Sequence, residues 1–131
     1  MALIPEPDTP VAADDRGEAR FWPLDELIGL PLAFDHAEII TEAIDRVRSK
    51  LEYTTVATSF LEDAFTLGEL RDIYEIVWGV DLDSANFARK IRAIPGFVSP
   101  TEGRRKTSGR SAQLYVAGDT HWMLPPMLRP A

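Results

Sequence analysis

Four polar side chains lie close together in the sequence and share the ability to form directional hydrogen bonds. They are Asn86, Arg89, Lys90 and Arg92. An arginine can donate two parallel hydrogen bonds to guanine, an asparagine pairs in the same way with adenine, and a lysine binds a base acceptor or a phosphate. On a helical wheel, the opposite face carries Phe87, Ile91 and Ile94. The spacing therefore predicts a helix that buries its apolar face and presents its basic face to the major groove of DNA.

A second group of cationic residues follows in a polar stretch. It consists of Arg104, Arg105, Lys106 and Arg110. We expect residues 99–109 to form an eleven-residue loop at the tip of a β-hairpin. Cationic side chains at such a tip suit contacts with the phosphate backbone or an adjacent minor groove. Two hydroxyl residues at the starts of predicted helices, Thr66 and Ser84, are also placed to donate hydrogen bonds to phosphates.

The charges are distributed unevenly along the chain. Residues 1–85 carry nineteen acidic and six basic residues, whereas residues 86–110 carry seven basic residues and one acidic residue. The overall net charge of −7 would oppose a nucleic-acid partner if the charges were mixed evenly. The segregation instead favours one surface that meets a polyanion, although a solvated basic loop accounts for the charge alone equally well.

Other kinds of chemistry find little support in the sequence. The absence of cysteine excludes disulfides, cysteine-based zinc sites and thiol nucleophiles. His36 and His121 have no metal-ligand spacing and no neighbouring nucleophile-elbow serine, and no glycine motif for phosphate binding occurs. Asp35 and His36 could form an acid/base pair, but a helix cap or a packing contact fits them better. We predict no catalytic, cofactor-binding or metal-binding residues, and hence no enzyme.

The length of 131 residues suits one compact domain. No apolar run approaches the roughly 18 to 20 residues of a membrane-spanning helix, and residues 1–10 do not resemble a secretory signal. We therefore expect a cytoplasmic protein, associated with the nucleoid if it binds DNA. The first twenty residues are rich in proline and carboxylates and are expected to form a loop or tail. The aromatic segment 21–24 is expected to be a strand or an anchoring segment.

Three helices are predicted before the hairpin. The first begins after an Asp35 cap and buries Ile40, Ile44, Val47 and Leu51. The second runs from Leu67 to about Trp78, after a capping box formed by Thr66 and Glu69. It ends at Gly79, which can take the left-handed conformation, and a short turn leads to the third helix, capped by Asp83. Residues 53–58, between the first two helices, read as a turn or a brief extended segment.

Residues 111–116 alternate in the manner of a half-buried strand. The apolar positions of the alternation are Ala112, Leu114 and Val116. Three helices followed by such a hairpin predict an α/β, mainly α, winged helix-turn-helix fold, with the hairpin as the wing.

Many short motifs occur in order between residues 32 and 116. They are Leu32–His36, Tyr53-Thr54, Phe65–Leu67, Glu69-Leu70, Tyr74-Glu75, Leu82-Asp83, Asn86-Phe87, Arg89-Lys90, Gly109-Arg110 and Ala112–Tyr115. This pattern resembles the C-terminal winged-helix domain of the Nudix-related transcriptional regulators, the NrtR-type repressors. The resemblance implies three parts: residues 1–33 as the remnant of, or linker from, an upstream Nudix-like domain, residues 34–118 as the winged helix-turn-helix, and residues 119–131 as a C-terminal tail.

The resemblance further implies a sequence-specific repressor of the kind that regulates NAD metabolism in response to ADP-ribose. Its partner would be double-stranded DNA with a palindromic operator, and the full-length form would be a homodimer. The Nudix box is absent from this sequence. ADP-ribose or a related nucleotide could therefore act only with the missing Nudix domain, and no cofactor is expected in this chain. The alternative is a winged-helix protein-interaction module without direct DNA binding.

Overall fold

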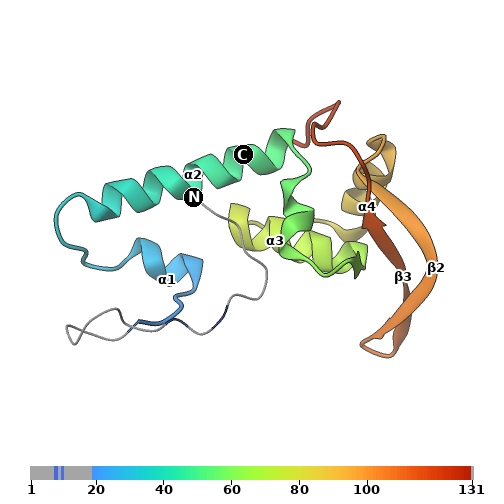
Figure 1. Cartoon of the computed structure of the whole chain (residues 1–131), viewed down its shortest axis with the longest axis horizontal. Helices are drawn as coiled ribbons and strands as arrows, with labels where there is room; N and C mark the ends of the chain where they lie inside the picture. Colours follow the sequence, from blue (N-terminus) through green and yellow to red (C-terminus); the bar gives the residue numbers. More distant parts are fainter. Residues whose placement is uncertain (1–7, 9, 11–18, 131) are drawn as a thin grey trace.

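The computed structural model describes residues 8, 10 and 19–130. Its elements in chain order are α1 (Leu24–Ile28), α2 (His36–Tyr53), the 3-10 helix η1 (Val56–Phe60), β1 (Ala64–Phe65), α3 (Leu67–Trp78), α4 (Ser84–Ala93), β2 (Val98–Thr107) and β3 (Arg110–Ala117). The three strands form one antiparallel sheet in the order β1-β3-β2. Figure 1 shows α2 at one side of the molecule and the β2–β3 hairpin projecting at the other. Among the described helices, none has the length and apolar character to cross a membrane.

Helix α2 begins at the predicted place but without the predicted cap. Asp35 occupies the N-cap position, yet its side chain accepts no hydrogen bond from the first turn. The apolar face is largely as expected, since Ile44 and Leu51 are buried and Val47 packs against the core. The long α2 is therefore stabilised by packing along its C-terminal half and not by a side-chain cap.

Local signals determine both ends of α3. The Thr66 hydroxyl accepts from the Glu69 backbone N–H at 3.1 Å, and the Glu69 carboxylate accepts from the Thr66 N–H at 2.8 Å, which confirms the capping box. Gly79 takes the left-handed conformation at φ 69°. In the turn that follows, Glu75 Oε1 accepts from the Leu82 N–H at 2.8 Å. This bond ties the turn to the helix that precedes it.

Helix α4 is capped and packed as its sequence predicts. The Asp83 carboxylate accepts from the Asn86 N–H at 2.7 Å. Phe87, Ile91 and Ile94 are all buried. The ring of Phe87 meets Tyr74 of α3 edge-on, with centroids 5.4 Å apart. The helix-turn-helix is therefore held by an apolar contact on one side and by capping at each start.

The hairpin differs from its prediction in length. The eleven-residue loop is wrong: β2 extends to Thr107, and only Ser108 and Gly109 form the turn, both with positive φ. The strand carries polar residues on both faces, so it lacks the apolar alternation by which strands are recognised. The register shifts between Pro100 and Arg104, as is common where a proline interrupts a ladder.

The core residues of β3 also differ from expectation. Tyr115 is the buried residue of the strand, whereas Ala112, Leu114 and Val116 are only partly buried. Strand β1, which pairs Phe65 with Tyr115, was not predicted. Two residues have no periodicity of their own, and β1 exists only because a strand fifty residues away covers it. Residues 56–60 form η1 rather than the extended segment or simple turn expected there.

The two ends of the chain also hold structure that their composition does not suggest. Within segment 21–24, Leu24 begins α1 after an N-cap Pro23, and no strand forms. Most of the loop or tail expected over the first twenty residues lies outside the described residues. At the other end, residues 119–130, predicted as a tail, place Met123 and Met127 in the core. Their N–H groups donate to the carbonyls of Tyr53 and Glu52 at 2.8 and 2.9 Å, so this segment is fastened to the end of α2.

Candidate nucleic-acid interface

The outer face of α4 carries the basic residues that its spacing predicts. Asn86, Arg89, Lys90 and Arg92 are all exposed, while the opposite face of the helix is buried. Arg89 Nη2 donates to the Asn86 side-chain oxygen at 2.5 Å. The two residues best suited to reading bases are therefore already paired one turn apart, which orients the guanidinium along the helix surface.

The remaining α4 residues lie at the edges of this face. Arg92 Nε donates to the Tyr115 hydroxyl at 3.3 Å, which leaves its terminal nitrogens available. The sequence does not predict Tyr115 as a partner, because the alternation in β3 places Ala112, Leu114 and Val116 on the apolar face and Tyr115 on the other. Ser84 is the first residue of α4 and is exposed. Its position is that of a phosphate donor at a helix start.

Thr66 does not reach the surface. Thr66 is only 4% exposed, and its hydroxyl oxygen already accepts a hydrogen bond in the capping box. A phosphate could reach it only if the start of α3 opened. The structure therefore places Thr66 apart from the other predicted contact residues. Helix capping and phosphate binding both call for a hydroxyl residue, so the sequence does not distinguish these two roles.

The basic residues of the wing divide between the two faces of the β2–β3 hairpin. Arg104 donates from Nε to the Ser111 hydroxyl at 2.7 Å and from Nη2 to the Ser111 carbonyl at 2.8 Å, so it lies across the hairpin. Lys106 and Arg110 are exposed on either side of the turn. Arg105 alternates to the other face and contacts Glu62 and Glu69. Three of the four predicted wing residues thus remain open to a ligand, and none of the three lies in a flexible loop.

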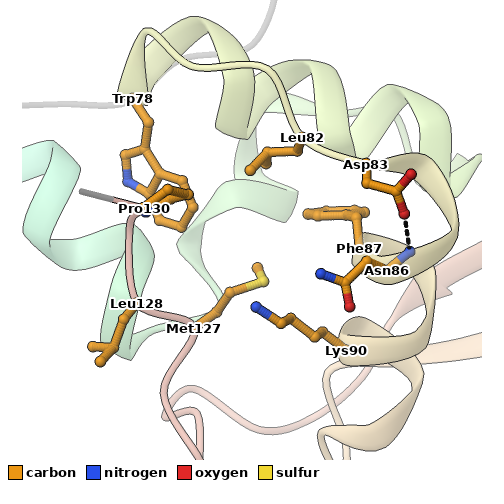
Figure 2. Close-up of a pocket in the computed structure, with 9 residues that line it drawn as sticks. All are labelled: Trp78, Leu82, Asp83, Asn86, Phe87, Lys90, Met127, Leu128 and Pro130. Atoms are coloured by element: carbon orange, nitrogen blue, oxygen red, sulfur yellow. Dashed lines mark hydrogen bonds between the residues drawn. The ribbon is translucent and has the colours of Figure 1, made fainter.

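A small pocket marks the other flank of α4 (Figure 2). Asn86 and Lys90 lie on one side of it, and Met127, Leu128 and Pro130 of the C-terminal segment lie on the other. Its volume is about 40 Å³, which is far below that of sites for drug-sized molecules. Asn86 and Lys90 therefore border the C-terminal segment, a neighbour that their sequence spacing does not reveal.

Across the described part of the chain, no group of three or more His, Asp or Glu side chains could hold a metal ion.

The winged-helix region matches a known family. Residues 57–117 match the sequence profile described as the NrtR DNA-binding winged helix domain. Over 107 residues, the chain is 37% identical to the ADPR responsive transcriptional repressor NtrR of Acinetobacter baylyi, and the match covers 80% of this chain and 42% of that protein.

Solved structures agree with the sequence comparison. The structure of Shewanella oneidensis NrtR complexed with a 27mer DNA is 33% identical and has a TM-score of 0.62. The structure of Shewanella oneidensis NrtR is 33% identical and has a TM-score of 0.61. Each match covers 73% of this chain and 43% of the other, so the chain spans about two-fifths of the length of these relatives. Residues 57–117 thus form a winged-helix domain of the NrtR type.

Proposed function

We propose that this chain binds double-stranded DNA and is the DNA-binding part of a transcriptional repressor. The observation that carries the proposal is the paired, exposed Asn86 and Arg89 on a helix whose other face is fully packed. The relative in Acinetobacter is named a transcriptional repressor, and a solved relative is in complex with DNA.

In the proposed mode, α4 enters the major groove and the wing meets the backbone. Arg89 and Asn86 read base edges, while Lys90, Arg92 and Ser84 contact bases or phosphates at the margins of the helix. Arg104, Lys106 and Arg110 hold phosphates beside the groove. Thr66 takes no part because it is buried.

We further propose that a palindromic operator is bound by a homodimer, since one winged helix alone contacts few base pairs. The effector would be ADP-ribose or a related nucleotide bound by a Nudix-related domain outside this chain, in keeping with the name of the Acinetobacter relative. The protein would then act at the nucleoid as a regulator of NAD metabolism and not as an enzyme.

Fluorescence anisotropy with labelled 27-base-pair duplexes tests the DNA-binding proposal. We expect the logarithm of the association constant to fall with the logarithm of salt concentration by about 0.9 per phosphate contact. A variant with Arg89→Glu and Lys90→Glu should lose binding at all salt concentrations used. The matched control, Arg46→Glu with Lys50→Glu on α2, changes the net charge equally and should retain most of the affinity.

Two outcomes would overturn the proposal. Equal losses in both variants would indicate that only the overall charge matters. Absence of binding by the wild-type chain at low salt, with its fold verified, would favour a protein-interaction module.

A further inference from the structure

We infer that Arg105 is a positioning residue that fastens the wing to the helical body and does not itself contact DNA. The effect of Arg105 on DNA binding rests on the proposed function. The attachment of the wing to the helical body rests only on the contacts of Arg105. In sequence, Arg105 is indistinguishable from its neighbours Arg104 and Lys106, which is why it is predicted to bind phosphate.

The Arg105 guanidinium lies among three acceptors on the body of the domain. Nη1 donates to Glu69 Oε1, and Nη2 lies 3.4 Å from Glu62 Oε2 and 3.3 Å from the Ala64 carbonyl oxygen. About a third of the side chain remains exposed. A guanidinium that already faces two carboxylates and a carbonyl presents little free positive charge to a phosphate.

Glu69 links this contact to the helix-turn-helix. Its second carboxylate oxygen, Oε2, accepts from the Thr66 N–H at 2.8 Å in the capping box of α3. One carboxylate therefore binds both the start of α3 and the outer half of β2. The angle between the wing and the helices depends on this residue because each oxygen serves a different element.

The outer half of the hairpin has few other ties to the body. Strand β1 pairs with β3 only at Tyr115 and Val116, so residues 104–113 have no third strand beside them. Arg104 bonds within the hairpin, to Ser111. In the described part of the chain, the side-chain hydrogen bonds that join residues 104–113 to the helices and β1 are those of Arg105.

The consequence for DNA binding follows from strand alternation. Arg105 lies between Arg104 and Lys106, which the strand directs to the opposite face. Fixing Arg105 to Glu69 and Glu62 therefore fixes the height and tilt at which its two neighbours are presented. A wing without this tie would keep the same charge on its open face but hold it in a wider range of positions.

Native-state hydrogen exchange followed by NMR tests the tie without DNA. Arg105→Gln should raise the exchange rates of amides in residues 104–113 at least fivefold and leave those of α3 unchanged. The matched control is Lys106→Gln, which removes the same charge from the adjacent position and should leave exchange unchanged. Unchanged exchange in Arg105→Gln would overturn the inference.

The direction in which Glu69→Gln changes the affinity for DNA distinguishes a positioning role of Arg105 from a direct contact with phosphate. Glu69→Gln removes an acidic charge, which by itself strengthens binding to a polyanion. It also leaves one oxygen where the carboxylate uses two, so either the cap or the Arg105 contact is lost. We expect Glu69→Gln and Arg105→Gln both to weaken duplex binding, by about threefold to tenfold at constant salt. Tighter binding by Glu69→Gln together with weaker binding by Arg105→Gln would make Arg105 a direct phosphate contact and overturn the inference.

Failure of the two proposals can be told apart. If the wild-type chain binds no duplex at low salt, the proposed function fails, and the exchange rates still decide whether Arg105 holds the hairpin.

Discussion

Gly118 approaches Gly96 so closely that a Cβ atom at position 118 would lie 1.9 Å from the Gly96 carbonyl oxygen. The Gly118 N–H donates to the Phe97 carbonyl at 2.8 Å, and the Gly96 carbonyl accepts from Thr120 at 3.2 Å. These contacts join the residues that precede β2 to those that follow β3. The base of the wing is therefore closed by backbone against backbone.

Gly118→Ala is expected to destabilise the fold by more than about 2 kcal/mol, because no flexible side chain can yield to the new methyl group. The control is Gly68→Ala in α3, where a Cβ would meet only the Thr66 hydroxyl at 3.7 Å. That change should be neutral or stabilising by about 0.5 kcal/mol through helix propensity. Urea unfolding of both variants measures the difference, and equal stabilities would contradict the close approach.

The two aspartates at helix starts should differ in their contributions. Asp83→Ala removes the bond to the Asn86 N–H and should cost about 1 kcal/mol. Asp35→Ala removes a side chain that makes no capping bond and should cost no more than a few tenths of that amount. Thermal unfolding monitored by circular dichroism suffices, and a larger effect at position 35 would refute the assignment of the caps.

The C-terminal segment should contribute measurably to stability. Met127 is 5% exposed, so Met127→Ala should cost about 2 to 5 kcal/mol through lost burial and the cavity left behind. The adjacent Leu128 is 59% exposed, and Leu128→Ala should cost under about 0.5 kcal/mol. Denaturant unfolding would contradict the packing if the two costs were similar.

Tyr74 makes stability depend on pH in the alkaline range. Its hydroxyl has no hydrogen-bond partner within the described structure, and burial raises the pKa of its phenol. The unfolded tyrosine ionises near pH 10 while the folded one stays neutral, so stability falls as pH rises above about 10. This contribution is fully present below that pH.

Tyr74→Phe removes both the unpaired hydroxyl and the titration. At neutral pH the variant should match or exceed the wild type, by up to about 1 kcal/mol. Between pH 8 and 11, the wild type should lose about 1.4 kcal/mol more than the variant. Urea titrations at the two pH values give this difference, and a constant gap between the proteins would show that Tyr74 does not titrate as expected.

The exposed wing residues should act without regard to DNA sequence. Arg110→Gln removes a phosphate contact in the proposed mode, so it should weaken binding to random and operator duplexes by the same factor and lower the salt slope by about 0.9. Arg46→Gln, an equal charge change on α2, should leave the slope unchanged. A loss confined to one duplex sequence would instead make Arg110 a base-reading residue.

Helices α3 and α4 could be predicted because their signals are local, whereas α1 and η1 could not. The capping box at Thr66, the cap at Asp83 and the left-handed Gly79 each depend on neighbours within four residues. The short β1 and the buried Met123 depend on partners far along the chain, which no local pattern encodes. The order of elements was enough to predict the fold, but not the length of the wing.

Prediction of the candidate site was limited by burial and by strand direction. Residue type alone cannot tell a buried cap from a phosphate donor, as Thr66 illustrates, nor a tethered arginine from a free one, as Arg105 illustrates. The α4 residues were found because an amphipathic helix separates its two faces by a fixed period. Strand β2 carries polar residues on both faces, so its sequence does not distinguish one face from the other.

The two-residue turn between β2 and β3 bears on the thermodynamics of association. An eleven-residue loop would have to be immobilised on binding, at an entropic cost of about 1 to 2 kcal/mol for each residue ordered. A hairpin that is paired up to Thr107 and Arg110 has already lost most of this conformational entropy during folding. Association should accordingly lack the large negative heat-capacity change of coupled folding, so that its temperature dependence reports the contacts with DNA and not the ordering of the protein.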